Sequence, residues 1–307
     1  MNKINFGNPL NGRKWLSLLE SNQLFGMTFK KKLHFDKSNL GFSFESNEFG
    51  LRGPKNINAN TVICGTSYAM GLSVDNGKNW YELDDFYSAF FNIGMPIGFK
   101  HHLKLLETYY KGDYDTLLLI YHPNIWVTNK NFYNAEKENL NIFSYMKWQT
   151  GILKTLYLYL RWLVKEKVKI LLHKKEIVHY LGKKYHLNLS YSYFSTKDEK
   201  NKKQILKDFY LLSNKFKRVI IYKVPIKEEV AFKYLSSEGL QKLNSNYAQM
   251  WNFFQHTVLN EHNTKVYDFS DKFDLGDYLE QDTHWNENGN IKFSKYLLET
   301  LKSENIC

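Results

Sequence analysis

Short apolar runs alternate with amphipathic stretches along most of this chain. Residues 1–60 are rich in Asn and Gly and show no clear periodicity. From residue 61 onward, continuous apolar runs typical of buried parallel strands alternate with segments of helical spacing. The expected strands cover 61–65, 90–94, 115–123, 218–225 and 264–270, and the expected helices cover 79–90, 99–110 and 288–303. This alternation predicts an α/β fold with a central parallel sheet.

A long interruption separates the third expected strand from the fourth. It opens with an apolar, basic stretch, 151–184, that we expect to be helical, and continues into a polar stretch, 191–204, that we expect to include a mobile loop. This insertion could serve as a lid, a membrane-surface helix or a partner-binding helix, or could simply pack its Leu and Trp on the main domain. The expected division of the chain is therefore an N-terminal segment packing on the core (1–60), a main domain in two pieces (61–124 and 216–307) and a basic helical insertion (125–215).

Composition indicates a folded protein, since 43% of the 307 residues are hydrophobic and 17% are aromatic. The first residues contain no apolar core of signal-peptide length, and no run of eighteen apolar residues occurs. The two cysteines, Cys64 and Cys307, make neither a disulfide framework nor a metal site. We therefore expect a cytoplasmic protein, with peripheral contact to the inner membrane through 150–182 as an open alternative.

The positive charge of the chain is concentrated in the insertion. The net charge is +11, and the stretch from Lys147 to Tyr185 holds ten Lys and Arg against two Glu, a net charge of +8. A protein that binds nucleic acid would more often spread basic residues over the whole fold. Nucleic acid is therefore not an expected partner.

Four short polar motifs follow expected strands or precede the last helix. Singly, each has an ordinary explanation as a helix cap or a turn. In parallel sheets, however, ligands bind at the carboxyl ends of the strands, where these motifs fall. The motifs are Gly65-Thr66-Ser67, Asn92-Ile93-Gly94, His122-Pro123-Asn124 and Asp282-Thr283-His284-Trp285.

In this order, Ser67, Gly94, Asn124 and His284 resemble the four blocks of the SGNH (GDSL-like) hydrolase superfamily. The sequence "NEFGLRGP" (47–54) resembles the segment that precedes the first block in bacterial members. The sequence "HWNENGN" (284–290) resembles their last block, in which asparagine caps the final helix and glycine enters its first turn. The resemblance covers about 47–304 outside the insertion, and it implies a three-layer, flavodoxin-like α/β fold.

The motifs contain the groups that acyl transfer requires. Ser67 would attack an ester carbonyl, and His284 would take the serine proton and later return it to the leaving alcohol. Asp282 would orient the imidazole through Nδ1–H. The oxyanion would be held by the backbone N–H groups of Ser67 and Gly94 and by the side-chain amide of Asn124.

The sequence departs from the pattern of the superfamily at three places. Thr66 stands where the family has aspartate, and His122-Pro123 replaces the usual surroundings of Asn124. The acid lies two residues before His284, whereas the common spacing is three and would fall on Gln281. This Asp-x-His-Trp sequence is similar to that of relatives of alginate O-acetyltransferases and of other bacterial glycan-modifying members.

Three residues near the motifs are candidates for substrate contact. We expect His122 to line the pocket. Trp126 and Trp285 flank the site in sequence and could stack on a sugar ring, with burial in the core as the alternative. Adjacent His101 and His102 face apart on a helix, and no carboxylate or cysteine set completes a zinc site, so we expect no metal and no bound cofactor.

The resemblance implies O-acetyl transfer to, or removal from, a bacterial surface carbohydrate such as a capsule-type polysaccharide. Acetyl-CoA is a candidate acyl donor, and the acceptor could be anionic. Two alternatives stay open: a lipid esterase that docks on membranes through 150–182, and a non-catalytic glycan-binding protein with the same fold.

Overall fold

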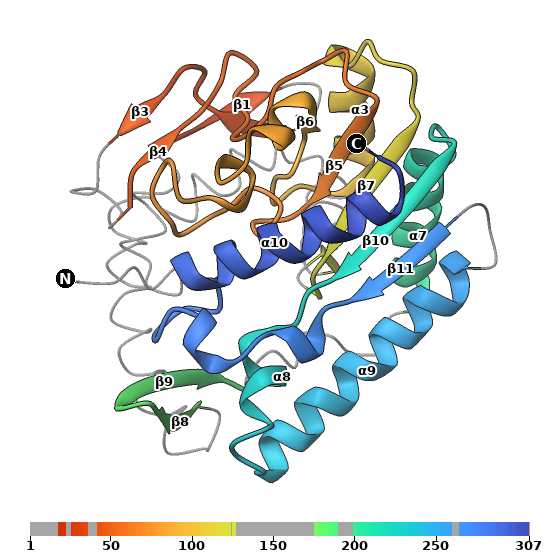
Figure 1. Ribbon diagram of the computed structural model, residues 1–307. Coiled ribbons are helices and arrows are strands. Elements are labelled where there is room, and N and C mark those ends of the chain that lie inside the picture. Colours follow the sequence, from red (N-terminus) through yellow and green to blue (C-terminus); the bar gives the residue numbers. More distant parts are fainter. Residues whose placement is uncertain are drawn as a thin grey trace, which may run out of the picture.

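The computed structural model describes residues 18–22, 26–35, 42–123, 125–126, 175–189, 199–259 and 264–306. Its centre is a five-stranded sheet in which neighbouring strands are parallel (Figure 1). The strands are β5 (Thr61–Gly65), β6 (Phe91–Asn92), β7 (Thr116–Tyr121), β10 (Arg218–Lys223) and β11 (Thr264–Asp268). These five strands confirm the expected α/β fold with a parallel sheet.

The spatial order of the strands places the topological switch point of the sheet beside β5. The order across the sheet is β11-β10-β7-β5-β6, so the chain runs from β5 to one neighbour, β6, and then returns to the other neighbour, β7. Counted along the chain, this is the order 2-1-3-4-5 of doubly wound folds, whose topological switch point lies between the first and third strands. Residues that follow β5 and β7 therefore meet where such sheets hold their ligands.

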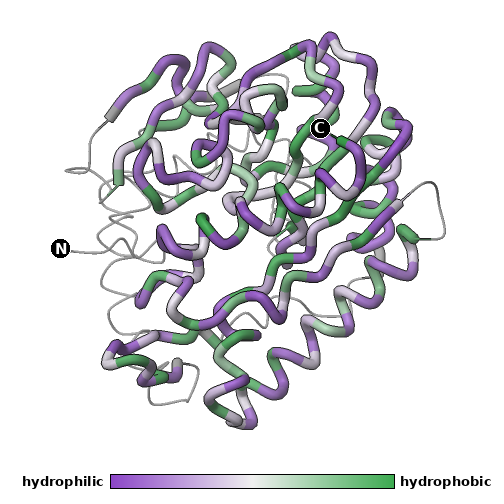
Figure 2. Tube along the Cα trace, viewed as in Figure 1, coloured by the Kyte–Doolittle hydropathy of each residue, from purple (hydrophilic) through white to green (hydrophobic). Residues whose placement is uncertain are grey.

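Helices cover both faces of the sheet, which is why the strands are continuous apolar runs. On one face, Phe99 of α3 (Phe99–Tyr109) packs on Phe209 of α7 (Glu199–Ser213), and Phe209 packs on Phe254 of α9 (Glu238–Leu259), with ring centroids 5.0 and 5.3 Å apart. On the other face lies α10 (Glu287–Ser303), in front of the sheet in Figure 1. Figure 2 shows hydrophobic positions running along the central strands between these helices.

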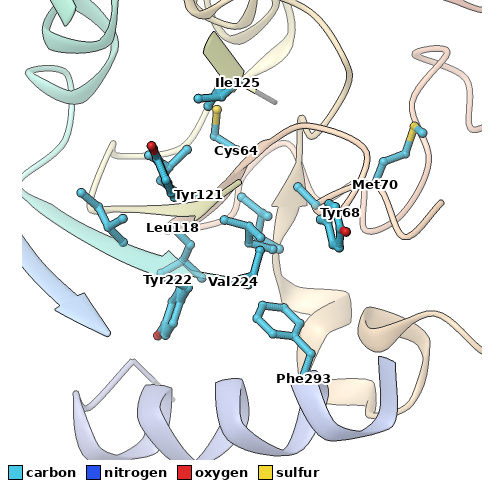
Figure 3. Close-up of a cluster of buried hydrophobic side chains, with 14 of the residues drawn as sticks. Cys64, Tyr68, Met70, Leu118, Tyr121, Ile125, Tyr222, Val224 and Phe293 are labelled. Atoms are coloured by element: carbon cyan, nitrogen blue, oxygen red, sulfur yellow. The ribbon is translucent and has the colours of Figure 1, made fainter. Parts of the chain in front are cut away.

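Successive side chains along each strand point to opposite faces of the sheet, so they pack against the helices on both sides. Figure 3 shows Tyr222 directed toward Phe293 and α10, whereas Cys64, Tyr121 and Ile125 lie on the opposite side of the sheet. Tyr121 meets Phe254 of α9 with ring centroids 4.8 Å apart. Cys64 is fully buried, and burial raises the pKa of its thiol.

The segment 79–90, expected to be one helix, forms two short 3-10 helices instead. These are η1 (Trp80–Glu82) and η2 (Asp85–Ala89). Asp84 interrupts the helical path, because its backbone is extended and its side chain accepts a hydrogen bond from the Phe86 N–H. Such a cap starts a new helical turn rather than continuing the previous one.

The described part of the N-terminal segment forms two small antiparallel pairs. The first joins β1 (Leu19–Asn22) to β2 (Gly26–Phe29), and the second joins β3 (His34–Phe35) to β4 (Phe44–Glu45). The two pairs pack together through Phe29 and Phe44, whose ring centroids lie 4.5 Å apart. Arg52 then ties this layer to the turn after β5 by donating to the Gly71 and Val74 carbonyls.

The described parts of the insertion correct one expectation. Residues Lys175–Tyr180 and Lys183–Asn188 form an antiparallel hairpin, β8 and β9, so the helix expected over 151–184 is wrong from residue 175 onward. The pattern there has period two, since Val178, Tyr185 and Leu187 are buried while Ile177 is exposed. Helix α7 begins at Glu199, within the polar stretch 191–204 that we expect to include a mobile loop. Residues 127–174 and 190–198 lie outside the described residues.

The remaining elements connect β10 and β11 to the final helix. Helix α8 (Lys227–Ala231) follows β10, and two 3-10 helices, η3 (Ser270–Lys272) and η4 (Leu275–Asp277), follow β11. Among the described helices, none has the length and apolar character needed to cross a membrane.

Candidate active site

Ser67, His284 and Asp282 form a hydrogen-bonded chain at the carboxyl edge of the sheet. Ser67 follows β5 by two residues, and its Oγ lies 2.7 Å from Nε2 of His284. On the other side of the imidazole, Nδ1–H donates to Oδ1 of Asp282, which also accepts the backbone N–H of His284 at 2.9 Å. Ser67 and His284 are each 8% exposed, so the serine hydroxyl faces its base in a largely water-free setting.

A sharp turn brings Ser67 to this position. Gly65 has φ +149°, and a Cβ there would lie 2.8 Å from both the Ile120 carbonyl oxygen and the Ala69 Cβ, so only glycine fits. The turn then closes on itself, since the Leu72 N–H donates to the Ser67 carbonyl at 3.0 Å. Among the described residues, the Ser67 N–H has no hydrogen-bond acceptor.

Asn286 fixes the loop that carries His284. As the N-cap of α10, its side chain accepts a hydrogen bond from the Gly289 N–H, and its amide donates to the Gly276 and Tyr278 carbonyls at 2.7 and 3.1 Å. The cap expected for the final helix is thereby confirmed. A Cβ at Gly289 would lie 2.4 Å from the Asp277 carbonyl oxygen, so this glycine permits the close approach of loop and helix.

Lys227 is a site residue that the sequence did not suggest. It is 1% exposed, and its Nζ donates to three backbone carbonyls of the loop that carries Asp282. These are the carbonyls of Asp282 at 2.8 Å, Leu279 at 3.2 Å and Glu280 at 3.4 Å. The ammonium therefore holds the backbone of the loop that carries Asp282. The sequence signal was slight, because a lysine at the start of a helix after the fourth strand reads as a surface residue.

The surroundings of Asp282 keep it ionised. Burial raises the pKa of this carboxyl, but the charge of His284, the hydrogen bonds from its ring and backbone, and the charge of Lys227 outweigh burial. The net effect lowers the pKa of Asp282 below its ordinary value. An ionised acid on Nδ1 fixes the tautomer in which Nε2 can accept the Ser67 proton.

Tyr68, also missed at the sequence level, links the first motif to the last. Its hydroxyl donates to the Thr283 carbonyl, and its ring stacks on His122 with centroids 4.2 Å apart and lies 5.3 Å from the ring of His284. Tyr68 therefore fills the space behind the Ser67–His284 pair. Its place beside the nucleophile was the only signal in the sequence.

Of the expected oxyanion donors, the Gly94 N–H has a hydrogen-bond partner and Asn124 is not described. The Gly94 N–H already donates to Asn92 Oδ1 at 2.8 Å, and the Asn92 amide donates to the Ala69 carbonyl at 2.9 Å. Gly94 thus supports the Ser67 turn, and it would serve an oxyanion only by sharing its N–H. Asn124 lies outside the described residues.

The three candidates for substrate contact are buried. His122 is 2% exposed behind Tyr68, and burial, followed by the charge of His284, holds its pKa well below the ordinary value. Trp126 donates its indole N–H to the Tyr121 hydroxyl at 2.9 Å, and Trp285 stacks on Phe273 with ring centroids 5.1 Å apart. Both tryptophans are buried in the core, which was the alternative to stacking on a sugar ring.

The described residues include no group of three or more His, Cys, Asp or Glu side chains that could hold a metal ion. No protein-family model, curated protein or solved structure matches the chain. The site is therefore interpreted from its own geometry. A serine hydroxyl in contact with an imidazole that is oriented by a carboxylate is the arrangement that activates a nucleophile for acyl transfer.

Proposed function

We propose that this chain is a serine acyl-ester enzyme of the SGNH type that works through an acyl-enzyme on Ser67. One observation carries the proposal: Ser67 Oγ lies 2.7 Å from His284 Nε2 while Asp282 accepts the opposite ring N–H. The 2-1-3-4-5 strand order and the place of Ser67 beside the switch point support it. So does the order of the four motifs along the chain.

The chemistry follows from the positions of the atoms. Ser67 Oγ bonds to the ester carbonyl carbon as its proton passes to His284 Nε2, and the resulting oxyanion accepts the Ser67 N–H. The bond to the leaving alcohol or thiol then breaks, and that group takes the proton from His284. Water or a sugar hydroxyl then bonds to the acyl carbon and loses its proton to His284. The bond from that carbon to Ser67 Oγ breaks, and Ser67 takes the proton back from His284.

The acyl group and acceptor are proposed from the sequence resemblance. The "HWNENGN" ending is similar to that of bacterial members that act on carbohydrate O-acetyl groups. The proposed acyl group is therefore an acetyl group. Inside the cell it would be delivered from acetyl-CoA or removed from an O-acetylated surface glycan. Transfer and hydrolysis would use the same residues and differ only in which acceptor reaches the acyl-enzyme.

The test is intact-protein and peptide mass spectrometry after brief incubation with p-nitrophenyl acetate or acetyl-CoA. We expect an acetyl adduct on Ser67, and release of p-nitrophenol that falls at least about 10³-fold in Ser67→Ala. Ser88→Ala is the matched control, because Ser88 is an exposed serine whose Oγ donates to the Asp85 carbonyl. Absence of any Ser67 adduct with either donor would contradict acetyl chemistry. Clearance of the adduct only when a glycan is added would identify a transferase.

A further inference from the structure

The turn of the β8–β9 hairpin carries an exposed leucine in a backbone conformation that leucine rarely adopts. Leu181 and Gly182 form the two-residue turn, with φ +47° and +72°. Such turns normally use Asn, Asp or Gly, because both central residues need positive φ. Leu181 is nevertheless 79% exposed, so packing does not account for its presence.

Aromatic and basic side chains surround this leucine. Tyr180 lies with its ring centroid 4.7 Å from that of Tyr234, which is 44% exposed, and Lys183 and Lys184 are exposed directly after the turn. We call these five residues, Tyr180, Leu181, Lys183, Lys184 and Tyr234, the hairpin patch. Residues 177–189 contain no Asp or Glu, so no acidic residue of the hairpin beyond Glu176 offsets its lysines.

The opposite face of the hairpin packs on the body of the molecule, near the edge of the sheet that carries Ser67. Val178, Tyr185 and Leu187 are buried, and β9 contacts α8 (Figure 1). The His186 N–H donates to the Glu280 carbonyl at 2.8 Å, which ties the hairpin to the loop of Asp282. A surface bound by the patch would therefore lie on the same side of the molecule as the loop of the candidate site.

We propose that the hairpin patch docks on an anionic lipid surface. The lysines would meet acidic headgroups, the tyrosines would lie at headgroup level, and Leu181 would enter the boundary of the acyl chains. A soluble polyanion would engage the lysines but would gain nothing from an exposed leucine. The hairpin also ends the stretch from Lys147 to Tyr185 that holds a net charge of +8. This inference goes beyond the proposed function and does not need it.

The test is co-sedimentation of the full chain with vesicles of phosphatidylglycerol and phosphatidylcholine, compared with vesicles of phosphatidylcholine alone. We expect binding to the anionic vesicles only. Leu181→Asn should weaken binding about 10-fold or more, while the melting temperature stays equal or rises by about 1–3 °C, because Asn suits the turn. The double variant Lys183→Gln, Lys184→Gln should weaken binding about 30-fold and reduce its dependence on salt.

The matched control is Leu211→Asn combined with Lys215→Gln and Lys217→Gln, around the end of α7, on the far side of the molecule from the hairpin in Figure 1. Leu211 is 50% exposed, and the control should bind as the wild type does. Failure of the wild type to prefer anionic vesicles would overturn the proposal. So would unchanged vesicle binding by Leu181→Asn, and loss confined to the lysine variant would identify a general polyanion site instead. Since the assay needs no turnover, an inactive but lipid-binding chain would separate this inference from the proposed function.

Discussion

The buried ammonium of Lys227 supports the candidate site without contacting the reacting atoms. Its Nζ donates to three backbone carbonyls of the loop that presents Asp282, and its charge helps to keep that carboxylate ionised. Holding reacting groups within a fraction of an ångström of the productive geometry is a large part of catalysis. We interpret Lys227 as a positioning residue for Asp282.

Replacing Lys227 by Met should therefore lower kcat for p-nitrophenyl acetate by about 10–100-fold while leaving KM nearly unchanged. Lys233→Met is the matched control, because Lys233 also donates to backbone carbonyls, those of Ser270 and Phe273, but does not reach Asp282. Steady-state kinetics of both variants check the expectation. Equal losses in the two variants would show that Lys227 matters only for folding.

Sequence reasoning at this scale proposed Ser67, His284 and Asp282 because their motifs follow a strand or precede the last helix and, in this order, resemble the blocks of the SGNH superfamily. It could not identify Lys227 or Tyr68, since their roles come from carbonyls and rings brought close by the fold. Neither residue is part of a motif that can be recognised in the sequence.

Among the elements, the strands were the most predictable and the connections the least. β7 is buried throughout, and β10 has a buried apolar centre between Arg218 and Lys223, so both runs are typical of strands that lie between helical layers. The hairpin at 175–188 was mistaken for a helix because its lysines and scattered apolar residues also suit a basic amphipathic helix. The burial of Val178, Tyr185 and Leu187 selects the period of two.

The two turns at the carboxyl edge depend on one close contact. A Cβ at Gly94 would lie 2.5 Å from the Ala69 Cβ, so Gly94→Ala should lower the free energy of unfolding by about 1–3 kcal/mol. Ala69→Gly in the same chain should restore part of that loss. Urea unfolding of the two single variants and the double variant measures the coupling. A Gly94→Ala chain that keeps full stability would contradict this expectation.

At the scale of the whole molecule, buried histidines couple stability to pH. Burial is the main cause that lowers the pKa of His102 to about 3 and that of His101 to about 4. Both are therefore neutral in the folded chain near pH 6, where the unfolded chain begins to bind protons on them. Their contribution is fully present above about pH 6.5 and is lost as the pH falls toward these lowered values.

We expect the free energy of unfolding to drop between pH 7 and pH 5, with His102 accounting for about 2 kcal/mol of the drop. The drop should shrink by that amount in His102→Gln, whatever the absolute stability of this variant. His34→Gln is the control, because the His34 side chain is 68% exposed, and it should keep the wild-type dependence. Urea denaturation at the two pH values tests this, and an unchanged drop in His102→Gln would contradict it.

Cys64 gives the molecule a built-in reporter. Its thiol lies in β5, fully buried, three residues before Ser67, and burial raises its pKa, so a thiol reagent can react only after the central strand separates from its neighbours. In a Cys307→Ser chain, the rate of Cys64 alkylation would therefore measure how often the sheet opens around β5. Acylation of Ser67 should lower this alkylation rate if the acyl group stabilises the turn that follows β5.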